Sequence, residues 1–243
     1  MTSCSQSGIM KDKRCIFLIL LLIYSEAFLV MHQTHQVQAQ QEPRWWAGYR
    51  HYGVAQIYSH PGVYGEIYTI NPYVPVGAYF LEWVATILAY RPIAYWVQVG
   101  YFKYWTYNAP HYYVEKNDSK GHDFYVFGVG PSTGSWHSYA TRRPADLPWE
   151  NSTDPKEWRL YIDNMLNPVR IYFVTPNRPV DEQAFAEVVV STGICITGSH
   201  FRNLRVYDPQ LYWFFWQCHV LRVDPPYTLI EISHREFRAA GGG

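Results

Sequence analysis

Apolar and polar residues alternate along the chain in short segments that end at glycine, proline or asparagine. Gly62–Ile70, for example, alternates until Asn71-Pro72, and Asp123–Val129 stops at Gly130-Pro131. A period of two places every second side chain on the same face of a β-strand. About eleven such segments follow one another with turn residues between them, and none is a convincing helix. This pattern predicts an all-β fold, either an antiparallel β-sandwich or a jelly roll.

The predicted strands share aromatic and β-branched side chains and are bounded by turn residues. They are Gly62–Ile70, Ala78–Tyr90, Ala94–Trp105, His111–Lys116, Asp123–Val129, Gly134–Arg142, Glu157–Ile162, Val169–Val174, Ala184–Thr192, Leu211–Val223 and Tyr227–Ser233. The length of Ala78–Tyr90 also permits a helix, but its composition favours a long strand. We expect residues 40–60 to form an irregular lead-in or an edge strand. Residues 61–236 are expected to form one β-sandwich domain, and residues 237–243 a flexible tail.

The amino-terminal region has the order of features that is typical of a secretory signal peptide. Lys11, Lys13 and Arg14 precede the unbroken apolar run Cys15–Tyr24, and Val37-Gln38-Ala39 provides a small-x-small cleavage pattern. We therefore expect residues 1–39 to be removed and the mature protein to be secreted to the cell exterior. The alternative is an uncleaved anchor, but residues 15–24 alone are too short to cross a bilayer. No later apolar run is long enough to predict a membrane span.

The composition excludes some partners and predicts one covalent link. Lys+Arg and Asp+Glu each number 20, and such a balanced surface offers no electrostatic field for nucleic acid. Beyond residue 39, none of the histidines has a second His or Cys at the short spacing of a zinc motif, so we expect no zinc site. Beyond the signal region, the remaining cysteines are Cys195 and Cys218. An even number in a secreted chain predicts one disulfide, and the alternative is two buried free thiols.

The segments Ala94–Trp105 and His111–Lys116 flank a short polar break and form a candidate hairpin. In a symmetric antiparallel register Gln98 lies opposite Glu115, with Cβ atoms roughly 4.5–5.5 Å apart. A slip of one residue would turn one of the two side chains to the other face of the sheet. A carboxyl group surrounded by aromatic rings can serve as a general acid or base, and an amide can donate to an oxyanion. The alternative is an ordinary polar contact between neighbouring strands.

Aromatic side chains share the face on which this pair would lie. Trp96, Gly100 and Phe102 have the same parity as Gln98, and Tyr113 has the same parity as Glu115. A glycine on the face of a strand often marks open space where a ligand approaches. We therefore expect Gly100 to leave room for a ligand beside the pair.

The order of three short motifs adds a resemblance to a known family. Glu82-Trp83-Val84, Trp96-Val97-Gln98-Val99-Gly100 and Tyr112-Tyr113-Val114-Glu115 occur in succession in an aromatic-rich β-protein. This order resembles the eqolisin (glutamic peptidase) family and its distant secreted relatives, over roughly residues 62–142. The resemblance implies a concanavalin A-like jelly roll that needs no metal or cofactor. It also implies that Glu115 activates water and that Gln98 stabilises the tetrahedral intermediate.

Two classes of function remain open at this point. The first is a hydrolase that cleaves peptides or polypeptides at acidic pH, with Gln98 and Glu115 as catalytic residues and Trp83, Trp96 and Tyr113 as substrate-binding residues. The second is a non-catalytic module that binds a glycan or a protein through exposed aromatic residues; the candidates are Trp45, Trp46, Tyr64 and Trp105. A purely structural surface protein is a third possibility. The neighbours Ser135 and His137 suggest a Ser–His pair, but the absence of a G-x-S-x-G motif favours simple packing.

Overall fold

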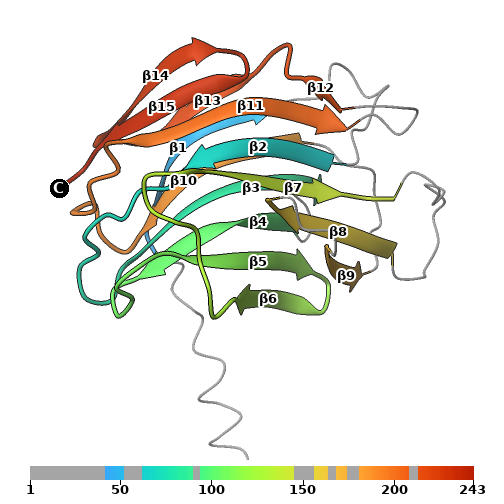
Figure 1. The fold of residues 1–243 in the computed structure, drawn as a ribbon, viewed down its shortest axis with the longest axis horizontal. Helices are drawn as coiled ribbons and strands as arrows, with labels where there is room; N and C mark the ends of the chain where they lie inside the picture. Colours follow the sequence, from blue (N-terminus) through green and yellow to red (C-terminus); the bar gives the residue numbers. More distant parts are fainter. Residues whose placement is uncertain are drawn as a thin grey trace, which may run out of the picture. The chain divides into compact units, whose positions relative to one another are not determined.

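The computed structural model describes residues 42–51, 62–89, 94–144, 156–163, 168–173, 181–207 and 213–243. The chain divides into two compact units, residues 1–42 and residues 43–243. The predicted signal peptide and its cleavage site lie outside the described residues. The second unit is built from two antiparallel sheets (Figure 1), which confirms the predicted all-β sandwich. Within the described ranges there is no helix that is long and apolar enough to cross a membrane.

The first sheet, called sheet A, has seven strands in the order β13-β1-β10-β3-β4-β5-β6. Its strands are β1 Arg44–His51, β3 Tyr79–Ala89, β4 Tyr95–Tyr104, β5 His111–Asp118, β6 Gly121–Val126, β10 Asp181–Val189 and β13 Val220–Val223. Strands β3, β4, β5 and β6 are consecutive in the sequence and pair as neighbours, as short connections favour. The segment Ala78–Tyr90, for which a helix was the alternative, contains strand β3.

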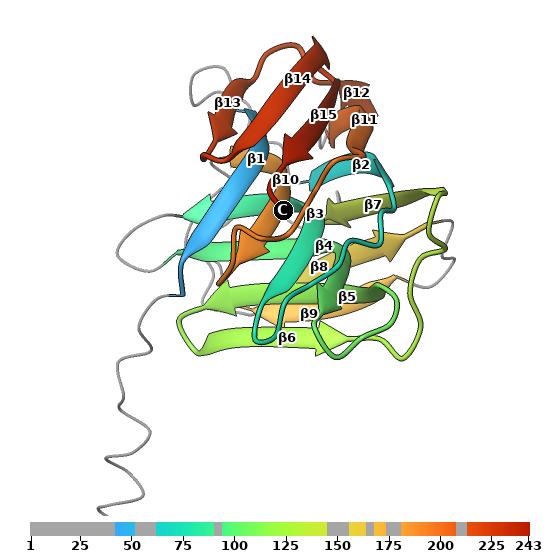
Figure 2. The same ribbon diagram turned by 90° about the vertical axis from the view of Figure 1, so that its left-hand side faces the viewer.

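The second sheet, called sheet B, has eight strands in the order β14-β15-β11-β2-β7-β8-β9, and β12 pairs with β11 outside this path. Its strands are β2 Gly62–Tyr68, β7 Trp136–Arg142, β8 Lys156–Ile162, β9 Val169–Phe173, β11 Ser199–Tyr207, β12 Trp213–Phe215, β14 Tyr227–Ser233 and β15 Glu236–Gly241. Figures 1 and 2 show the sheets as two layers, with β6 and β9 at one end and β13 and β14 at the other.

The main core lies between the two sheets and is built from alternate residues of each strand. In β4, Val97, Val99 and Tyr101 are completely buried and belong to the same cluster as Ile67 and Phe201 of sheet B. Burial of one such side chain stabilises the fold by about 1.5–3 kcal/mol. Because these inward positions are fixed, the residues between them face away from sheet B.

A second apolar cluster lies on that outward face of sheet A. Its buried members are Leu81, Trp83, Ala85, Ile87, Phe102, Tyr113, Phe185 and Val189. Partly buried rings pack against them, among them Trp46, Trp96 and Phe124. The sheet therefore carries apolar side chains on both faces, and polar groups on the outward face are surrounded by rings.

Several boundaries differ from those that the sequence predicts. Strand β1 is neither an irregular lead-in nor an edge strand, because it pairs with β10 on one side and with β13 on the other. The expected flexible tail, residues 237–243, instead contributes most of β15, where Phe237 and Ala239 are buried in the core. Strand β11 was not predicted, and the segment Leu211–Val223 contains two strands in place of one.

The predicted disulfide is wrong, because Cys195 and Cys218 are both free thiols. Cys195 lies in the connection between β10 and β11, whereas Cys218 lies between β12 and β13. A disulfide requires the two Cα atoms to approach within about 7 Å with converging Cβ atoms. The number of cysteines in a sequence carries no information about that geometry.

Candidate functional site

The site is built on the pairing of β4 with β5. Gln98 and Glu115 are direct partners in this ladder, which confirms the register that the hairpin symmetry predicts. On the other side of β4, Gln98 pairs with Ala85 of β3. Since Val97 and Val99 face the core, the side chains of Gln98 and Glu115 both lie on the outward face of sheet A. These two residues are called the dyad below.

The side-chain amide of Gln98 joins two other polar groups of β5. Its Nε2 donates to Glu115 Oε2 at 3.1 Å and to the hydroxyl oxygen of Tyr113 at 2.6 Å. Tyr113 is completely buried, and burial raises the pKa of its hydroxyl well above 10. Tyr113 therefore remains protonated and holds the Gln98 amide in one orientation.

A histidine from the next strand contacts the other oxygen of the carboxylate. His122 Nε2 lies 2.6 Å from Glu115 Oε1, and the His122 side chain is 48% exposed, against 8% for that of Glu115. The hydrogen bond to Glu115 raises the pKa of His122 above its ordinary value of 6.5, although partial burial opposes the rise. In mildly acidic solution His122 is therefore an imidazolium, which lies at the exposed side of the site and contacts the Glu115 carboxyl group.

Trp83 is fixed by an ion pair that the sequence does not predict, between the buried Glu187 and the exposed Arg44. Its Nε1 donates to Glu187 Oε2 at 2.9 Å, and Arg44 binds the other oxygen of that carboxylate at 2.9 Å. Burial raises the pKa of Glu187, the positive charge of Arg44 opposes this, and the nearby charge of Glu115 adds to the rise. A second carboxyl group thus lies within electrostatic range of the dyad, supplied by β10 from a distant part of the sequence.

The three predicted substrate-binding residues occupy different positions. Trp83 and Tyr113 are buried, so in this structure they support Glu187 and Gln98 and do not present their rings to solvent. Trp96 is partly exposed and lies beside His122, with 6.2 Å between the ring centroids. Of the three, Trp96 is the one placed to meet a molecule that approaches past His122.

Gly100 does not leave the open space that the sequence suggests. A Cβ atom added there would lie 1.9 Å from the backbone oxygen of Glu82 and 2.8 Å from the Cα of Trp83. The glycine is therefore required by the close approach of β3 and β4. It contributes to the site by allowing Trp83 to sit beside the strand that carries Gln98.

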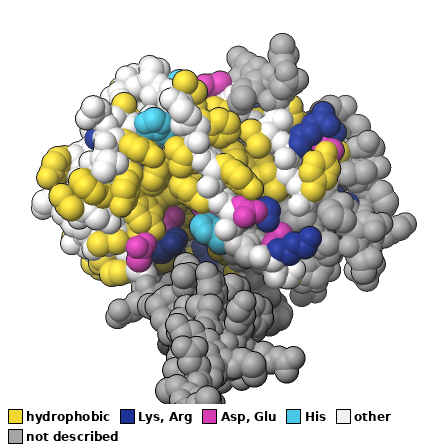
Figure 3. All heavy atoms as spheres, turned by 90° about the horizontal axis from the view of Figure 1, so that it is seen from below, with side chains coloured by type: hydrophobic (Ala, Val, Ile, Leu, Met, Phe, Trp, Pro, Cys, Tyr) yellow, Lys and Arg dark blue, Asp and Glu magenta, His cyan; other side chains and the backbone are white. Residues whose placement is uncertain are grey.

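The dyad itself is shielded, since Gln98 and Glu115 are each 6% exposed. Neither residue of the dyad lines the two cavities described next. A cavity of about 210 Å³ adjoins Tyr64, Arg142 and Trp213, and one of about 670 Å³ adjoins Lys116, Phe127 and Ile171. Figure 3 shows hydrophobic side chains gathered, with charged groups and histidine among them, on the face seen from below, at the end where β6 and β9 lie. Access to Glu115 therefore depends on the half-exposed His122.

His137, near the start of β7, takes part in a hydrogen-bonded chain. Its Nε2 lies 3.0 Å from Ser132 Oγ, and its Nδ1 lies 2.8 Å from Asp163 Oδ2. The Asp163 carboxylate also accepts from the Ser138 backbone N–H at 2.9 Å and from the Tyr112 hydroxyl at 3.1 Å. These contacts join β5, β7 and the turn after β8. The partner of His137 is thus Ser132, and not its near neighbour Ser135.

Glu82 lies on the opposite face of β3 from the dyad and is completely buried in the core. It accepts a hydrogen bond from the Tyr101 hydroxyl, and burial raises its pKa to about 8. Its parity with Phe80 and Val84, which are both buried, was the signal in the sequence that pointed to the core.

One group of side chains in the described part of the chain is close enough together to hold a metal ion, namely His219, Glu231 and His234. Glu231 lies in β14, His219 directly precedes β13 and His234 directly follows β14, so none of them lies on the strands that carry the dyad. The two histidines are far apart in the sequence, so local motif spacing did not reveal them.

Comparisons with known proteins identify the fold. No protein-family model matches the sequence, and no curated protein matches it. Among solved structures, two crystal structures of Scytalido-glutamic peptidase, one with a peptide-based transition state analog and one with a transition state analog inhibitor, align with TM-scores of 0.54 and 0.56. Their sequence identities are 10% and 11%, and each alignment covers 82% of this chain and 99% of the other.

A third solved structure is that of SCP-B, described as a member of the eqolisin family of peptidases in a complex with the tripeptide Ala-Ile-His. It aligns with a TM-score of 0.50 at 10% identity, again over 82% of this chain and 99% of the other. The chain therefore has the two-sheet β-sandwich fold seen in glutamic peptidases of the eqolisin type. At this level of identity the likeness establishes the fold, which agrees with the family resemblance noted in the sequence.

Proposed function

We propose that this protein is a hydrolase of the glutamic peptidase type, in which Gln98 and Glu115 activate water to cleave a peptide bond. The observation that carries the proposal is the hydrogen bond between the two side chains on the outward face of sheet A. The fold shared with the peptidase structures supports it. The dyad also lies among buried aromatic rings, where electrostatic interactions with a reacting group are stronger than in water.

In the proposed reaction the Glu115 carboxylate takes a proton from a water molecule as the water oxygen attacks the carbonyl carbon of the peptide. The Gln98 N–H that contacts Glu115 Oε2 in the structure then donates to the negatively charged oxygen of the tetrahedral intermediate, while the second N–H stays on the Tyr113 hydroxyl. Glu115 then passes its proton to the amide nitrogen, the C–N bond breaks, and the amine leaves. Glu115 carries out both proton transfers and Gln98 stabilises the intermediate, so the proposed reaction needs no metal or cofactor.

His122 gives this mechanism its proposed pH dependence. Its imidazolium form adds a positive charge beside the site of the developing oxyanion, and this form predominates below its raised pKa. The activity is therefore expected to be highest in acidic solution and to fall as the pH rises through the pKa of His122. Because His122 is half-exposed, it can move aside to admit a peptide, and Trp96 can then contact that peptide.

The experiment that tests the proposal is digestion of a generic unfolded protein at about pH 4, followed by mass spectrometry of the products. The wild-type chain should release peptides, and Glu115→Gln and Gln98→Ala should each abolish the release. Glu66→Gln is the matched control, since it removes a strand carboxylate that is hydrogen bonded to Arg202, Asn203 and Tyr64 in sheet B. Equal activity in the wild type and in both dyad variants would refute the proposal.

The shielding of the dyad favours a second candidate, a secreted binding module without catalysis. Trp105 is 40% exposed and lies beside Tyr104, with 5.8 Å between the ring centroids, and such rings can stack on a sugar or a partner protein. The other candidate aromatics lie elsewhere: Trp46 in the outward cluster of sheet A, and Tyr64 against Trp213. The same digestion assay separates the two candidates, because a binding module releases no peptides.

A further inference from the structure

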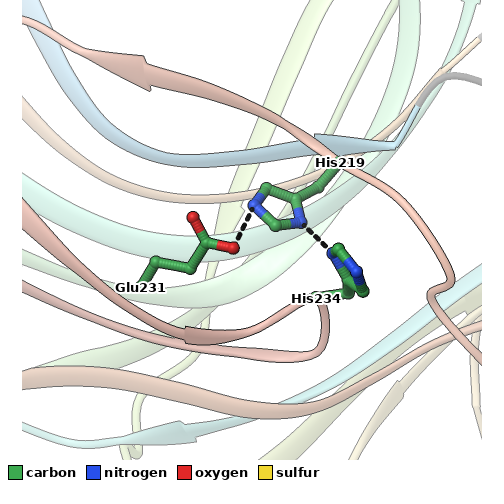
Figure 4. A group of neighbouring side chains, drawn as sticks. All are labelled: His219, Glu231 and His234. Atoms are coloured by element: carbon green, nitrogen blue, oxygen red, sulfur yellow. Dashed lines mark hydrogen bonds and ion pairs between the residues drawn. The ribbon is translucent and has the colours of Figure 1, made fainter.

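The connection before β13 and the hairpin formed by β14 and β15 bring two imidazole rings together. His219 Nδ1 and His234 Nδ1 lie 3.1 Å apart, and Glu231 Oε1 lies 3.3 Å from His219 Nε2 (Figure 4). His219 directly precedes β13, Glu231 lies within β14, and His234 lies in the turn between β14 and β15. Figure 4 shows His219 between the other two side chains, with a different ring nitrogen directed at each.

We infer that His219 and His234 form a binding site for a divalent transition metal ion of the zinc class. In a tetrahedral site the metal–nitrogen distance is roughly 2.0–2.1 Å, so two nitrogen ligands lie about 3.3 Å apart. The 3.1 Å between the two Nδ1 atoms is close to this separation. A metal ion can therefore take the place of the shared proton with a small widening of the pair.

Neighbouring side chains hold the ring of His219 in the orientation that metal binding requires. Its ring stacks on Tyr49, with 3.9 Å between the centroids and 15° between the planes, and its side chain is only 5% exposed. The carboxylate of Glu231 faces Nε2, which favours the tautomer that carries its proton there and leaves the Nδ1 lone pair directed at His234. A carboxylate that accepts from the second ring nitrogen commonly orients histidine ligands of metals. Glu231 thus has a positioning role, and solvent can complete the coordination at the exposed side of His234.

The site lies between the edge strands of the two sheets. β13 is an edge strand of sheet A, where it pairs with β1, and β14 is an edge strand of sheet B, where it pairs with β15. Figures 1 and 2 both show β13 and β14 close together at the same end of the sandwich. A metal ion held by His219 and His234 would therefore join the edges of the two sheets. Since the unfolded chain does not hold these rings together, binding would stabilise the folded state.

Zinc titration of the full chain tests this inference, with calorimetry to measure binding and thermal unfolding to measure stability. We expect one equivalent of Zn²⁺ to bind, and the unfolding temperature to rise by about 5–10 °C when free Zn²⁺ is a hundred times Kd. Replacement of Zn²⁺ by Co²⁺ should give visible absorption bands that report nitrogen ligands.

His234→Ala is the decisive variant, because His234 is exposed in a turn and its removal should leave the fold and the metal-free unfolding temperature unchanged. It should abolish both binding and the rise in unfolding temperature. Glu231→Gln should weaken binding about tenfold or more. His200→Ala is the matched control: it removes another histidine paired with a carboxylate, Glu236, and should bind Zn²⁺ like the wild type.

Absence of zinc binding in the wild type would overturn the inference. So would binding that persists in His234→Ala, which would indicate an adventitious ion only.

Discussion

The buried carboxyl group of Glu82 should make the free energy of unfolding of this protein fall as the pH rises from about 4.5 to about 8. Glu82 is completely buried between the sheets, and burial raises its pKa from 4.5 to about 8. The folded state therefore keeps a proton on Glu82 at pH values where the unfolded chain has lost it. Linkage then requires the free energy of unfolding to fall as the pH rises between these two values.

The size of the effect follows from the two pKa values. The interval from 4.5 to about 8 corresponds to about 5 kcal/mol of stability, since each pKa unit is worth about 1.4 kcal/mol. This contribution is fully present below the unfolded-state pKa and is lost by the time the pH passes the folded-state pKa. Glu82→Gln keeps the shape and the acceptor for the Tyr101 hydroxyl but cannot ionise. Since the group is half titrated at each end of that interval, the variant should lose about 4 kcal/mol less than the wild type between pH 4.5 and pH 8.

Urea denaturation at pH 4.5 and pH 8, followed by tryptophan fluorescence, measures this difference directly. Glu66→Gln is the control. Although burial acts to raise the pKa of Glu66, the hydrogen bonds from Arg202, Asn203 and Tyr64 lower it below its ordinary value. Its loss should leave the pH dependence in this interval unchanged. If Glu82→Gln and the wild type lose equal stability between the two pH values, Glu82 is ionised in the folded state and the reasoning is refuted.

Three further predictions concern the site. His122→Ala should remove the decline of activity on the alkaline side, and an unchanged pH profile would show that the raised pKa of His122 has no part in catalysis. Gly100→Ala should prevent folding or lower the unfolding temperature sharply, because the new Cβ would meet the backbone oxygen of Glu82 at 1.9 Å; a stable variant seen by circular dichroism would contradict the packing described here. Ser132→Ala and a serine-directed covalent inhibitor should both leave peptide release intact, since we assign the contact between Ser132 and His137 a structural role. Loss of activity in either case would show that Ser132 and His137 belong to the active site.

The sequence predicted the pairing of the dyad because that pairing depends on local information. A short polar break between two strands fixes a symmetric register, and Gln98 then faces Glu115 whichever sheet the hairpin joins. The same reasoning could not find Glu187 or Arg44. They reach the site from β10 and β1, and the order of strands in a sheet depends on contacts between distant segments.

Other failures have equally specific causes. Strand β11 carries two arginines, a histidine and an asparagine among its nine residues, so its alternation was hidden by long polar side chains that cover the surface. Strand β15 was mistaken for a tail because two alanines and a glycine end it, although Phe237 and Ala239 are core residues. His122 could have been found, since in the hairpin of β5 and β6 it pairs with Asn117, two residues beyond Glu115.

The central claim is that Gln98 and Glu115 act together on a peptide bond. Its most direct measurement is the rate of peptide release from an unfolded protein at about pH 4 by the wild type, Gln98→Ala, Glu115→Gln and the double variant. Either single change should reduce the rate to the background level, and the double variant should be no worse than either. Release that continues at the wild-type rate in both single variants, with the fold intact by circular dichroism, would contradict it.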